Sequence, residues 1–137
     1  MTTHSMNETT ILTGGRRLLR LALRLDAVVT GVNGLAYLAL AGPLHDLLGL
    51  GTGTGRAIGA FLLLYAAAVW IVSLPVEPRR LAVSAVIETN LLWVVLSLTA
   101  VVTGWLSLTT VGSVWAILQA GTVGAFAALQ FAARRRA

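Results

Sequence analysis

The sequence predicts an all-α membrane protein, a bundle of four transmembrane helices. The chain has 137 residues, of which 57% are hydrophobic and only 11% are charged. A soluble domain normally contains about 25% charged residues, so this chain has too few charges to cover a surface that faces water. It also contains four long apolar runs that lack strict alternation of apolar and polar residues. Lipid requires each segment to satisfy its own backbone hydrogen bonds, and therefore helices are predicted rather than strands.

The apolar runs define the domain organisation. Each is close to the ~20 residues that a helix needs to cross a membrane. Residues 1–14 are mostly polar and are expected to form a disordered cytoplasmic tail, whereas residues 15–137 are expected to form a single four-helix transmembrane domain. The runs lie at Leu21–Ala41, Ala57–Leu74, Leu81–Val102 and Leu108–Ala133.

The first run has an alternative interpretation as a cleaved signal peptide, because arginines precede it and the "ALA" at 39–41 resembles a cleavage site. The run is longer than the apolar part of a usual signal peptide, and it contains Asp26 and Asn33. These residues share a helical face with Thr30 and Tyr37, as expected for a helix packed in a bundle. A retained first span is therefore the preferred interpretation.

The two halves of the chain show a faint internal repeat. A shift of 57 positions places Asn33 on Asn90 and Gly55 on Gly112. Each half would then be one helical hairpin. Because a hairpin contains two spans, the two hairpins would have the same orientation and form a parallel repeat. Shared apolar composition is the alternative source of such matches.

The positive charges predict the orientation. All ten basic residues are arginines, and only Arg56 lies on the opposite side of the predicted spans from the other nine. The positive-inside rule then places both termini in the cytoplasm, and we expect the chain in a bacterial cytoplasmic membrane. This distribution favours contact with anionic lipids and not with nucleic acid. The nine are Arg16, Arg17, Arg20, Arg24, Arg79, Arg80, Arg134, Arg135 and Arg136.

Several kinds of chemistry are disfavoured by the residues present. The chain has no cysteine, which excludes disulfides and thiolate metal sites. Its two histidines, His4 and His45, lie outside the apolar runs, so haem ligation within the membrane is not expected. We therefore expect no catalytic metal, no cofactor and no catalytic residue that a motif identifies.

The candidate functional site is centred on Glu88. Counted from Leu81 at ~1.5 Å per residue, it lies about 10 Å into the bilayer, where an ionised carboxylate costs several kcal/mol unless it is paired or solvated. We therefore expect Glu88 to face the bundle or a wet cavity. Asn90 lies on the opposite face of the same run, together with Trp93 and Ser97, and is expected to face another helix or another subunit.

The partners expected for Glu88 are polar residues on the first and fourth runs. Two interpretations remain open: these groups join the helices by hydrogen bonds, or they form a site for a ligand, a proton or a cation. The candidate partners are Asp26, Thr30, Asn33, Tyr37 and Gln119.

A stripe of small residues marks the fourth run. Small residues at intervals of four let two helix backbones approach closely in lipid. The neighbour is expected to be a helix of the same chain or of a second copy in a homo-oligomer. The stripe comprises Gly112, Ala116, Ala120, Gly124 and Ala128.

Three stretches carry a resemblance to known proteins. They are "LRLDAVVTGVNGLAYLALAGPL", "NLLWVVLSL" and "TTVGSVWAILQAGTVGAFAALQ". Together they resemble the small four-span integral membrane proteins of GC-rich bacteria. The topology is similar to that of the DoxX-like and SPW-repeat groups, although this chain has no "SPW" triplet. The resemblance implies a four-helix membrane fold and assigns no functional residue.

Two hypotheses for function follow. The first is a non-enzymatic, oligomeric membrane protein that binds or passes a lipid-like or small amphiphilic solute at the polar site around Glu88. The alternative is an intramembrane enzyme that acts on a lipid or isoprenoid, with Glu88 as acid or base and Asp26 as its partner. The expected partners are membrane lipids, a second copy of the chain and a small amphiphile, and no nucleic acid.

Overall fold

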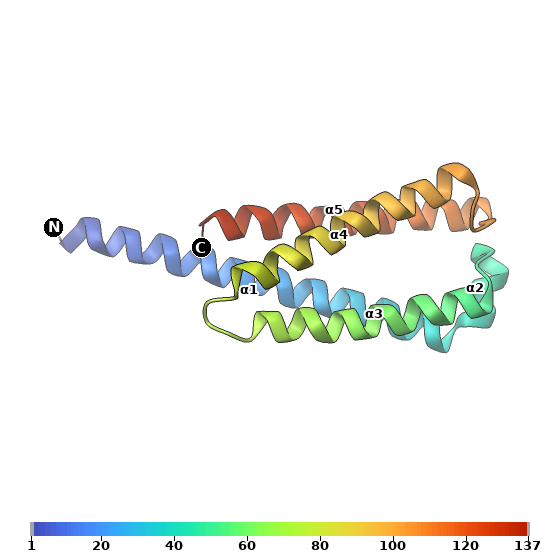
Figure 1. The fold of residues 1–137 in the computed structure, drawn as a ribbon, viewed down its shortest axis with the longest axis horizontal. Helices are drawn as coiled ribbons and strands as arrows, with labels where there is room; N and C mark the ends of the chain where they lie inside the picture. The colour runs from blue at the N-terminus through green and yellow to red at the C-terminus, as the bar shows by residue number, and fades with distance from the viewer. Residues whose placement is uncertain (1, 137) are drawn as a thin grey trace.

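The protein is built from helices alone within the part that the structure describes (Figure 1). The structure is a computed structural model that describes the backbone of residues 2–136 and the side chains of residues 14–136. The predicted disordered tail, except for Gly14, lies outside the residues whose side chains are described. The elements are α1 (Thr2–Ala39), α2 (Ala41–Leu48), α3 (Thr52–Ser73), α4 (Arg80–Thr103) and α5 (Thr110–Arg136).

Four of these helices are long and apolar enough to cross a membrane, so the predicted four-helix bundle is confirmed. The candidate spans are Gly14–Ala39, Thr52–Ser73, Arg80–Thr103 and Thr110–Arg136. The remaining helix, α2, lies in the connection between the first two spans. It tolerates Pro43 because the first turn of a helix needs no backbone N–H donors, and it ends at Gly49 in the left-handed conformation that glycine adopts easily.

The spans pair as two hairpins. α1 packs extensively on α3, α4 packs on α5, and α1 also packs on α5, whereas the backbones of α3 and α4 come close at few positions. Figure 1 shows α4 starting near α1 at one end of the bundle and crossing to α5 towards the other end. α3 and α4 are thus neighbours near their connecting loop and diverge beyond it. The paired hairpins have the arrangement that a parallel repeat requires, while the repeat in the sequence stays a prediction.

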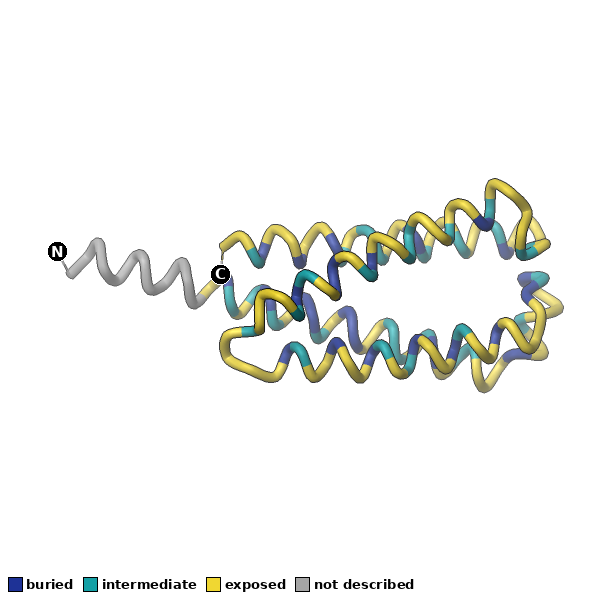
Figure 2. The backbone as a smooth tube through the Cα atoms, in the orientation of Figure 1, coloured by how far each residue is buried: buried dark blue, intermediate teal, exposed yellow. Residues whose placement is uncertain are grey.

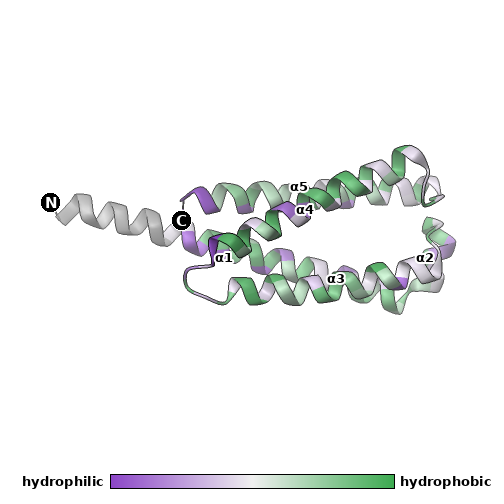
Figure 3. Ribbon diagram, viewed as in Figure 1, coloured by the Kyte–Doolittle hydropathy of each residue, from purple (hydrophilic) through white to green (hydrophobic). Residues whose placement is uncertain are grey.

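The outer surface of the bundle is apolar. Figure 2 shows that buried residues line the faces between the helices, and Figure 3 shows hydrophobic residues continuing around the outside. Leu64, Leu81 and Val102 are 75%, 84% and 84% exposed. Water would be a poor solvent for such a surface on all sides. Four apolar helices with this exterior fit a multi-pass integral membrane protein.

Two glycines let α1 and α3 approach each other closely. A Cβ atom built on Gly59 would lie 2.8 Å from the carbonyl oxygen of Gly34, and one on Gly34 would lie 2.9 Å from the carbonyl oxygen of Gly59. Both distances are shorter than real Cβ contacts allow, so the two backbones meet because neither residue has a side chain. This pair of glycines sets the distance between the helices of the first hairpin.

The small-residue stripe of α5 is only partly at a helix interface. Gly112 and Ala120 are buried and Ala116 and Gly124 are partly buried, but Ala128 is exposed and does not pack on a helix of the same chain, so for Ala128 a role in contact with a second copy stays a prediction. The buried positions of α5 recur about every 3.5 residues, and a stripe repeated every four residues rotates away from the interface. The fully buried residues of α5 are Gly112, Ala120, Ala127, Gln130 and Ala133.

Arginines of α1 hold the end of α3. Arg20 donates hydrogen bonds from Nε to the carbonyl oxygen of Ser73 at 3.1 Å and from Nη2 to that of Leu74 at 3.3 Å. Arg24 donates to the hydroxyl of Ser73 at 3.4 Å and lies over the ring of Trp70. The last carbonyl groups of a helix lack hydrogen-bond donors, and its C-terminal end carries a partial negative charge. The guanidinium groups donate hydrogen bonds to these carbonyl groups and balance the charge.

Candidate functional site

A buried cluster of polar side chains joins all four spans. We call it the polar core; it consists of Asp26 and Thr30 from α1, Tyr65 from α3, Asn90 from α4 and Gln130 from α5. Asp26, Asn90 and Gln130 are 1%, 2% and 0% exposed. Polar groups buried this completely inside an apolar bundle are costly unless every one of them is hydrogen-bonded.

The carboxylate of Asp26 is the centre of the polar core. Its Oδ2 atom accepts hydrogen bonds from Nδ2 of Asn90 at 2.9 Å and from Nε2 of Gln130 at 2.8 Å. Its Oδ1 atom accepts a hydrogen bond from the hydroxyl of Thr30 at 3.0 Å. The two amides are also bonded to each other, from Nδ2 of Asn90 to Oε1 of Gln130 at 3.1 Å. Three helices therefore meet at one carboxyl group.

Tyr65 connects the remaining span to the polar core. Its hydroxyl lies 2.9 Å from Oδ1 of Asn90 and 3.1 Å from the carbonyl oxygen of Val86, and these two acceptors share its single proton. No buried side-chain nitrogen or oxygen lacks a hydrogen-bond partner among the described residues. A polar network with every group satisfied makes the helices rigid and specifies one arrangement of the bundle.

Glu88 does not lie in the polar core. Its side chain is exposed on the outer face of α4, so the expectation that it faces the bundle beside Asn33 or Gln119 is wrong. Asn90, which is expected to face another helix or another subunit, is buried against α1 and α5 of the same chain. The reason is the phase of α4: Asn90 follows Val83, Val86 and Ile87 at helical spacing, and these apolar residues form the face that packs.

A second group of polar residues lies in the half of the bundle nearer α2. Nδ2 of Asn33 donates to Oε1 of Gln119 at 3.4 Å, and the indole Nε1 of Trp115 donates to the hydroxyl of Tyr37 at 2.9 Å. Both pairs join α1 to α5. The first hairpin and the second are thus connected by polar contacts at two levels, one at the polar core and one here.

Two cavities lie beside this second group, and we call them the inner cavities. Their volumes are about 70 and 40 Å³, and both are lined by Tyr37, Trp93 and Gln119. Each exceeds the ~10–15 Å³ that a water molecule needs by this measure. The smaller cavity also borders Thr30 of the polar core and Asn33. Apolar walls with a few convergent polar groups are typical of small-molecule sites. Both cavities are smaller than the ~300–1,000 Å³ of such sites, so a ligand larger than a few water molecules would have to move the helices apart.

Stacked aromatic rings bridge α3 and α4 next to the inner cavities. The ring centroids of Phe61 and Trp93 are 6.0 Å apart, those of Phe61 and Tyr65 are 5.9 Å apart, and both pairs are nearly parallel. The backbones of these helices come close at few positions, and the rings span part of the gap between them.

The structure therefore distributes the predicted site residues over two groups and leaves one outside. Asp26, Thr30 and Asn90 belong to the polar core, and Asn33, Tyr37 and Gln119 belong to the second group. Glu88 belongs to neither.

Two members of the polar core were not among the predicted site residues, Tyr65 and Gln130. A signal for Gln130 exists in the sequence, because it has the helical phase of Ala127 and Ala133 on the packed face of α5. Among residues 14–136 there is no group of three or more His, Asp or Glu side chains that could hold a metal ion.

Comparison with known proteins gives no family assignment. No protein-family model matches the chain, and neither a curated protein nor a solved structure matches it. The resemblance to small four-span bacterial membrane proteins and to the DoxX-like and SPW-repeat groups stays a prediction.

Proposed function

We propose that the protein is a multi-pass protein of a bacterial cytoplasmic membrane that binds a small amphiphile in the inner cavities. The observation that carries this proposal is the pair of adjoining cavities that share Tyr37, Trp93 and Gln119. They lie inside a bundle whose exterior is apolar, next to α3 and α4, whose backbones come close at few positions. A ligand dissolved in the lipid would reach them from the side.

The side chains around the cavities suit a ligand with an apolar body and a polar group. The ring of Trp93 offers a flat apolar wall. Asn33 and Gln119 each carry two N–H donors and an acceptor oxygen, and the single bond of 3.4 Å between them leaves both amides able to bind a ligand. A hydroxyl or amide of the amphiphile would insert between these two residues. The neighbouring polar core keeps α1, α4 and α5 in place around the ligand.

The enzyme hypothesis gains no support from the geometry. It requires Glu88 and Asp26 to act together, but Glu88 is exposed on the outside of α4 and Asp26 is 1% exposed within the polar core. A general acid and its partner must reach the same reacting group. The binding hypothesis uses residues that the bundle brings together, and for this reason it is the one proposed here, with its site moved from Glu88 to the inner cavities.

The orientation in the membrane forms part of the proposal. The arginine-bearing ends of α1, α4 and α5 lie at the same end of the bundle (Figure 1), which supports a cytoplasmic location for that end. Reporter fusions after Ala137 and within residues 49–54 should report opposite compartments, the first in the cytoplasm. A C-terminus found outside the cell would contradict the orientation, and a mature chain starting at Gly42 would restore the signal-peptide interpretation.

Tryptophan fluorescence tests the binding proposal. Trp93 and Trp115 line the inner cavities, whereas Trp70 and Trp105 lie outside them. One variant keeps only Trp93 and Trp115, which we call the cavity pair of tryptophans, and a second variant keeps only Trp70 and Trp105. In each variant phenylalanine replaces the other two tryptophans. Bromododecanol, whose bromine quenches nearby indoles, is added to both variants in lipid vesicles. Saturable quenching of the cavity pair alone is expected. Equal and non-saturating quenching of both pairs would mean that the probe only dissolves in the lipid, and would refute the proposal.

Substitutions in the polar pair provide the second part of the test. Gln119→Leu and Asn33→Leu should each weaken the binding of bromododecanol in the inner cavities by roughly tenfold. Each substitution removes one hydrogen bond to the hydroxyl of the probe and leaves the group that faced the removed amide unsatisfied. Thr99→Leu serves as the control, because Thr99 is an exposed polar residue of α4 that lines neither cavity and whose hydroxyl bonds only to the carbonyl oxygen of Val95 in its own helix. Binding unchanged in both cavity variants would contradict the assigned role of the two amides.

A further inference from the structure

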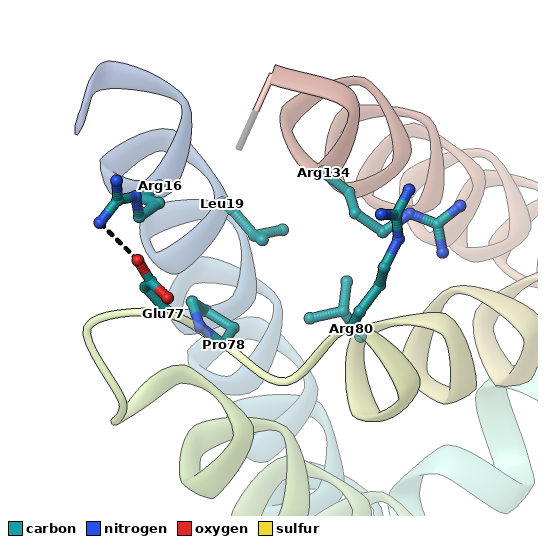
Figure 4. A pocket seen from close by; sticks show the side chains of 7 residues that line it. Arg16, Leu19, Glu77, Pro78, Arg80 and Arg134 are labelled. Carbon is teal, nitrogen blue, oxygen red and sulfur yellow. Dashed lines mark ion pairs between the residues drawn. The ribbon is translucent and has the colours of Figure 1, made fainter. Parts of the chain in front are cut away.

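A pocket lies at the end of the bundle that carries the arginines, away from the inner cavities. Its volume is about 320 Å³, within the range of ~300–1,000 Å³ that is typical of small-molecule sites. α1, the loop between α3 and α4, and the facing ends of α4 and α5 form its walls (Figure 4). We call it the arginine pocket; its charged lining residues are Arg16, Glu77, Arg80 and Arg134.

The charges in the arginine pocket are unbalanced. Figure 4 shows Arg16 paired with Glu77 on one side and Arg80 and Arg134 together on the other side. The Arg16–Glu77 pair is 2.8 Å long, and its side chains are 31% and 72% exposed. Three arginines and one glutamate leave two excess positive charges around a single cavity. Like charges gathered in this way repel each other unless an anion lies between them.

Contacts hold Arg134 in this position, and Arg80 lies beside it at the start of α4. Arg134 donates from Nη1 to the hydroxyl of Ser84 on α4, and its guanidinium lies 5.4 Å from the ring centroid of Phe131. Arg80 is the first residue of α4, where the backbone N–H groups add a partial positive charge. The neighbouring arginines of α1 are engaged differently, because Arg20 and Arg24 bond to the end of α3. Arg80 and Arg134 are therefore the pair placed to bind an added anion.

The floor of the pocket is apolar. Leu19 and Val83 line it, and they are 2% and 0% exposed as members of the core. A charged rim above an apolar floor, at the end of a bundle that fits a membrane, suits a molecule with an anionic group joined to a hydrocarbon part. Guanidinium groups bind phosphate oxygens through pairs of parallel hydrogen bonds. Basic pockets between transmembrane helices on the cytoplasmic side bind phosphorylated lipid head groups by the same chemistry.

We infer that the arginine pocket is a phosphate site, in which Arg80 and Arg134 bind the phosphate group of an anionic lipid or of a soluble phosphorylated compound. The Arg16–Glu77 pair forms the opposite wall. Because this pair is exposed, it can separate at little cost and admit the ligand. The inference does not depend on the inner cavities, with which the arginine pocket shares no residue.

Binding of defined probes to the purified protein in maltoside micelles tests this inference. The probes are dioctanoyl phosphatidic acid, dioctanoyl phosphatidylcholine and inorganic phosphate, and the dissociation constant of each is measured by calorimetry. The pocket variant is Arg80→Gln/Arg134→Gln. The matched control is Arg135→Gln/Arg136→Gln, which removes the same charge from the same end of the bundle at two exposed residues outside the pocket.

The expected result is preferential binding of phosphatidic acid over phosphatidylcholine. The pocket variant should bind phosphatidic acid at least about tenfold more weakly, and the control variant should stay within about twofold of the unmodified protein. Inorganic phosphate that binds as tightly as phosphatidic acid, with the same dependence on Arg80 and Arg134, would support the site and assign it to a soluble compound.

Three results would overturn the inference. They are equal affinity of the unmodified protein for phosphatidic acid and phosphatidylcholine, equal weakening in the pocket and control variants, and no measurable binding of any phosphate probe. The first and third need no substitution, so they decide the matter even if the pocket variant does not fold. Arg80→Lys/Arg134→Lys keeps both charges but not the planar donor pairs, and it should recover part of the affinity.

Discussion

The polar core should contribute strongly to stability, and Asn90→Leu is the substitution that tests it most directly. Leucine is close to asparagine in size, so the change removes polar contacts without leaving a large cavity. The side chain of Asn90 donates to Asp26 and to Gln130 and accepts a hydrogen bond from Tyr65. All three contacts vanish in the variant, and the site is 2% exposed, so bulk water does not replace them.

The magnitude follows from what each partner loses. Asp26 keeps its bonds to Gln130 and Thr30, and the lost bond to a carboxylate is worth about 1.5–3 kcal/mol. Oε1 of Gln130 becomes a buried acceptor without a donor, which lowers the free energy of unfolding by about 1–3 kcal/mol. The hydroxyl of Tyr65 can still donate its proton to the carbonyl oxygen of Val86, so the loss of its contact with Asn90 costs little stability. Hydrogen bonds between membrane helices are often weaker, near ~0.6 kcal/mol. We therefore expect a loss of about 3 kcal/mol.

The assay is reversible unfolding of the reconstituted protein in mixed micelles with increasing sodium dodecyl sulfate. The matched control is Thr99→Leu, an exposed polar residue of the same helix whose hydroxyl bonds only to the carbonyl oxygen of Val95. The control should change the free energy of unfolding by less than about 0.5 kcal/mol. A loss of less than about 1 kcal/mol for Asn90→Leu would refute the reasoning, because the polar core would then contribute no more than an exposed bond.

Three further substitutions can be measured by the same unfolding assay. Gly59→Ala should destabilise the protein by about 1–3 kcal/mol, because its Cβ would lie 2.8 Å from the carbonyl oxygen of Gly34; Gly121→Ala, where a Cβ meets nothing within 4 Å, should stabilise it by up to about 1 kcal/mol, and equal effects would contradict the close approach. Asp26→Asn should lower the free energy of unfolding by less than about 1 kcal/mol, since the oxygen of the new amide can still accept hydrogen bonds from both neighbouring amides. A decrease as large as the one that Asp26→Leu causes would mean that the charge itself is required. Glu88→Leu should leave stability unchanged or raise it, because an exposed carboxylate is unfavourable in lipid; a loss above about 1 kcal/mol, or a change in oligomer size, would show that another chain covers this residue.

The fold could be predicted because it depends on the balance of apolar and polar residues along the chain. Four apolar runs in lipid leave helices as the natural solution, and the structure has four such helices. The short α2 was not predicted, because its eight residues are too few for a clear periodic signal. The contact between Gly34 and Gly59 was also missed. Many glycines occur in the spans, and only the relative rotation of two helices decides which of them meet.

The candidate site was predicted less well, because the sequence shows which residues are polar but not which face of a helix is packed. Glu88 was chosen for its charge and expected depth. The rotation of α4 is set by Val83, Val86 and Ile87, and it places Asn90 inside and Glu88 outside. Both faces of α4 carry polar groups, so polarity alone could not decide between them. Asp26 was correctly placed on the packed face of α1, yet its partners on α4 and α5 depend on contacts that lie far apart in the chain.

The polar core has a consequence for the order in which the chain is synthesised. Asp26 and its two amide donors, Asn90 and Gln130, are separated by 64 and 104 residues. At ~5–20 residues per second, the ribosome needs about 5–20 s after Asp26 to supply Gln130. During this interval α1 holds a carboxylate that lacks two of its three donors, so it must stay near the insertion machinery or the lipid head groups until α5 enters. A chain that stops after α3 lacks Asn90 and Gln130, so it would keep Asp26 in the membrane at a free-energy cost that the finished chain does not bear.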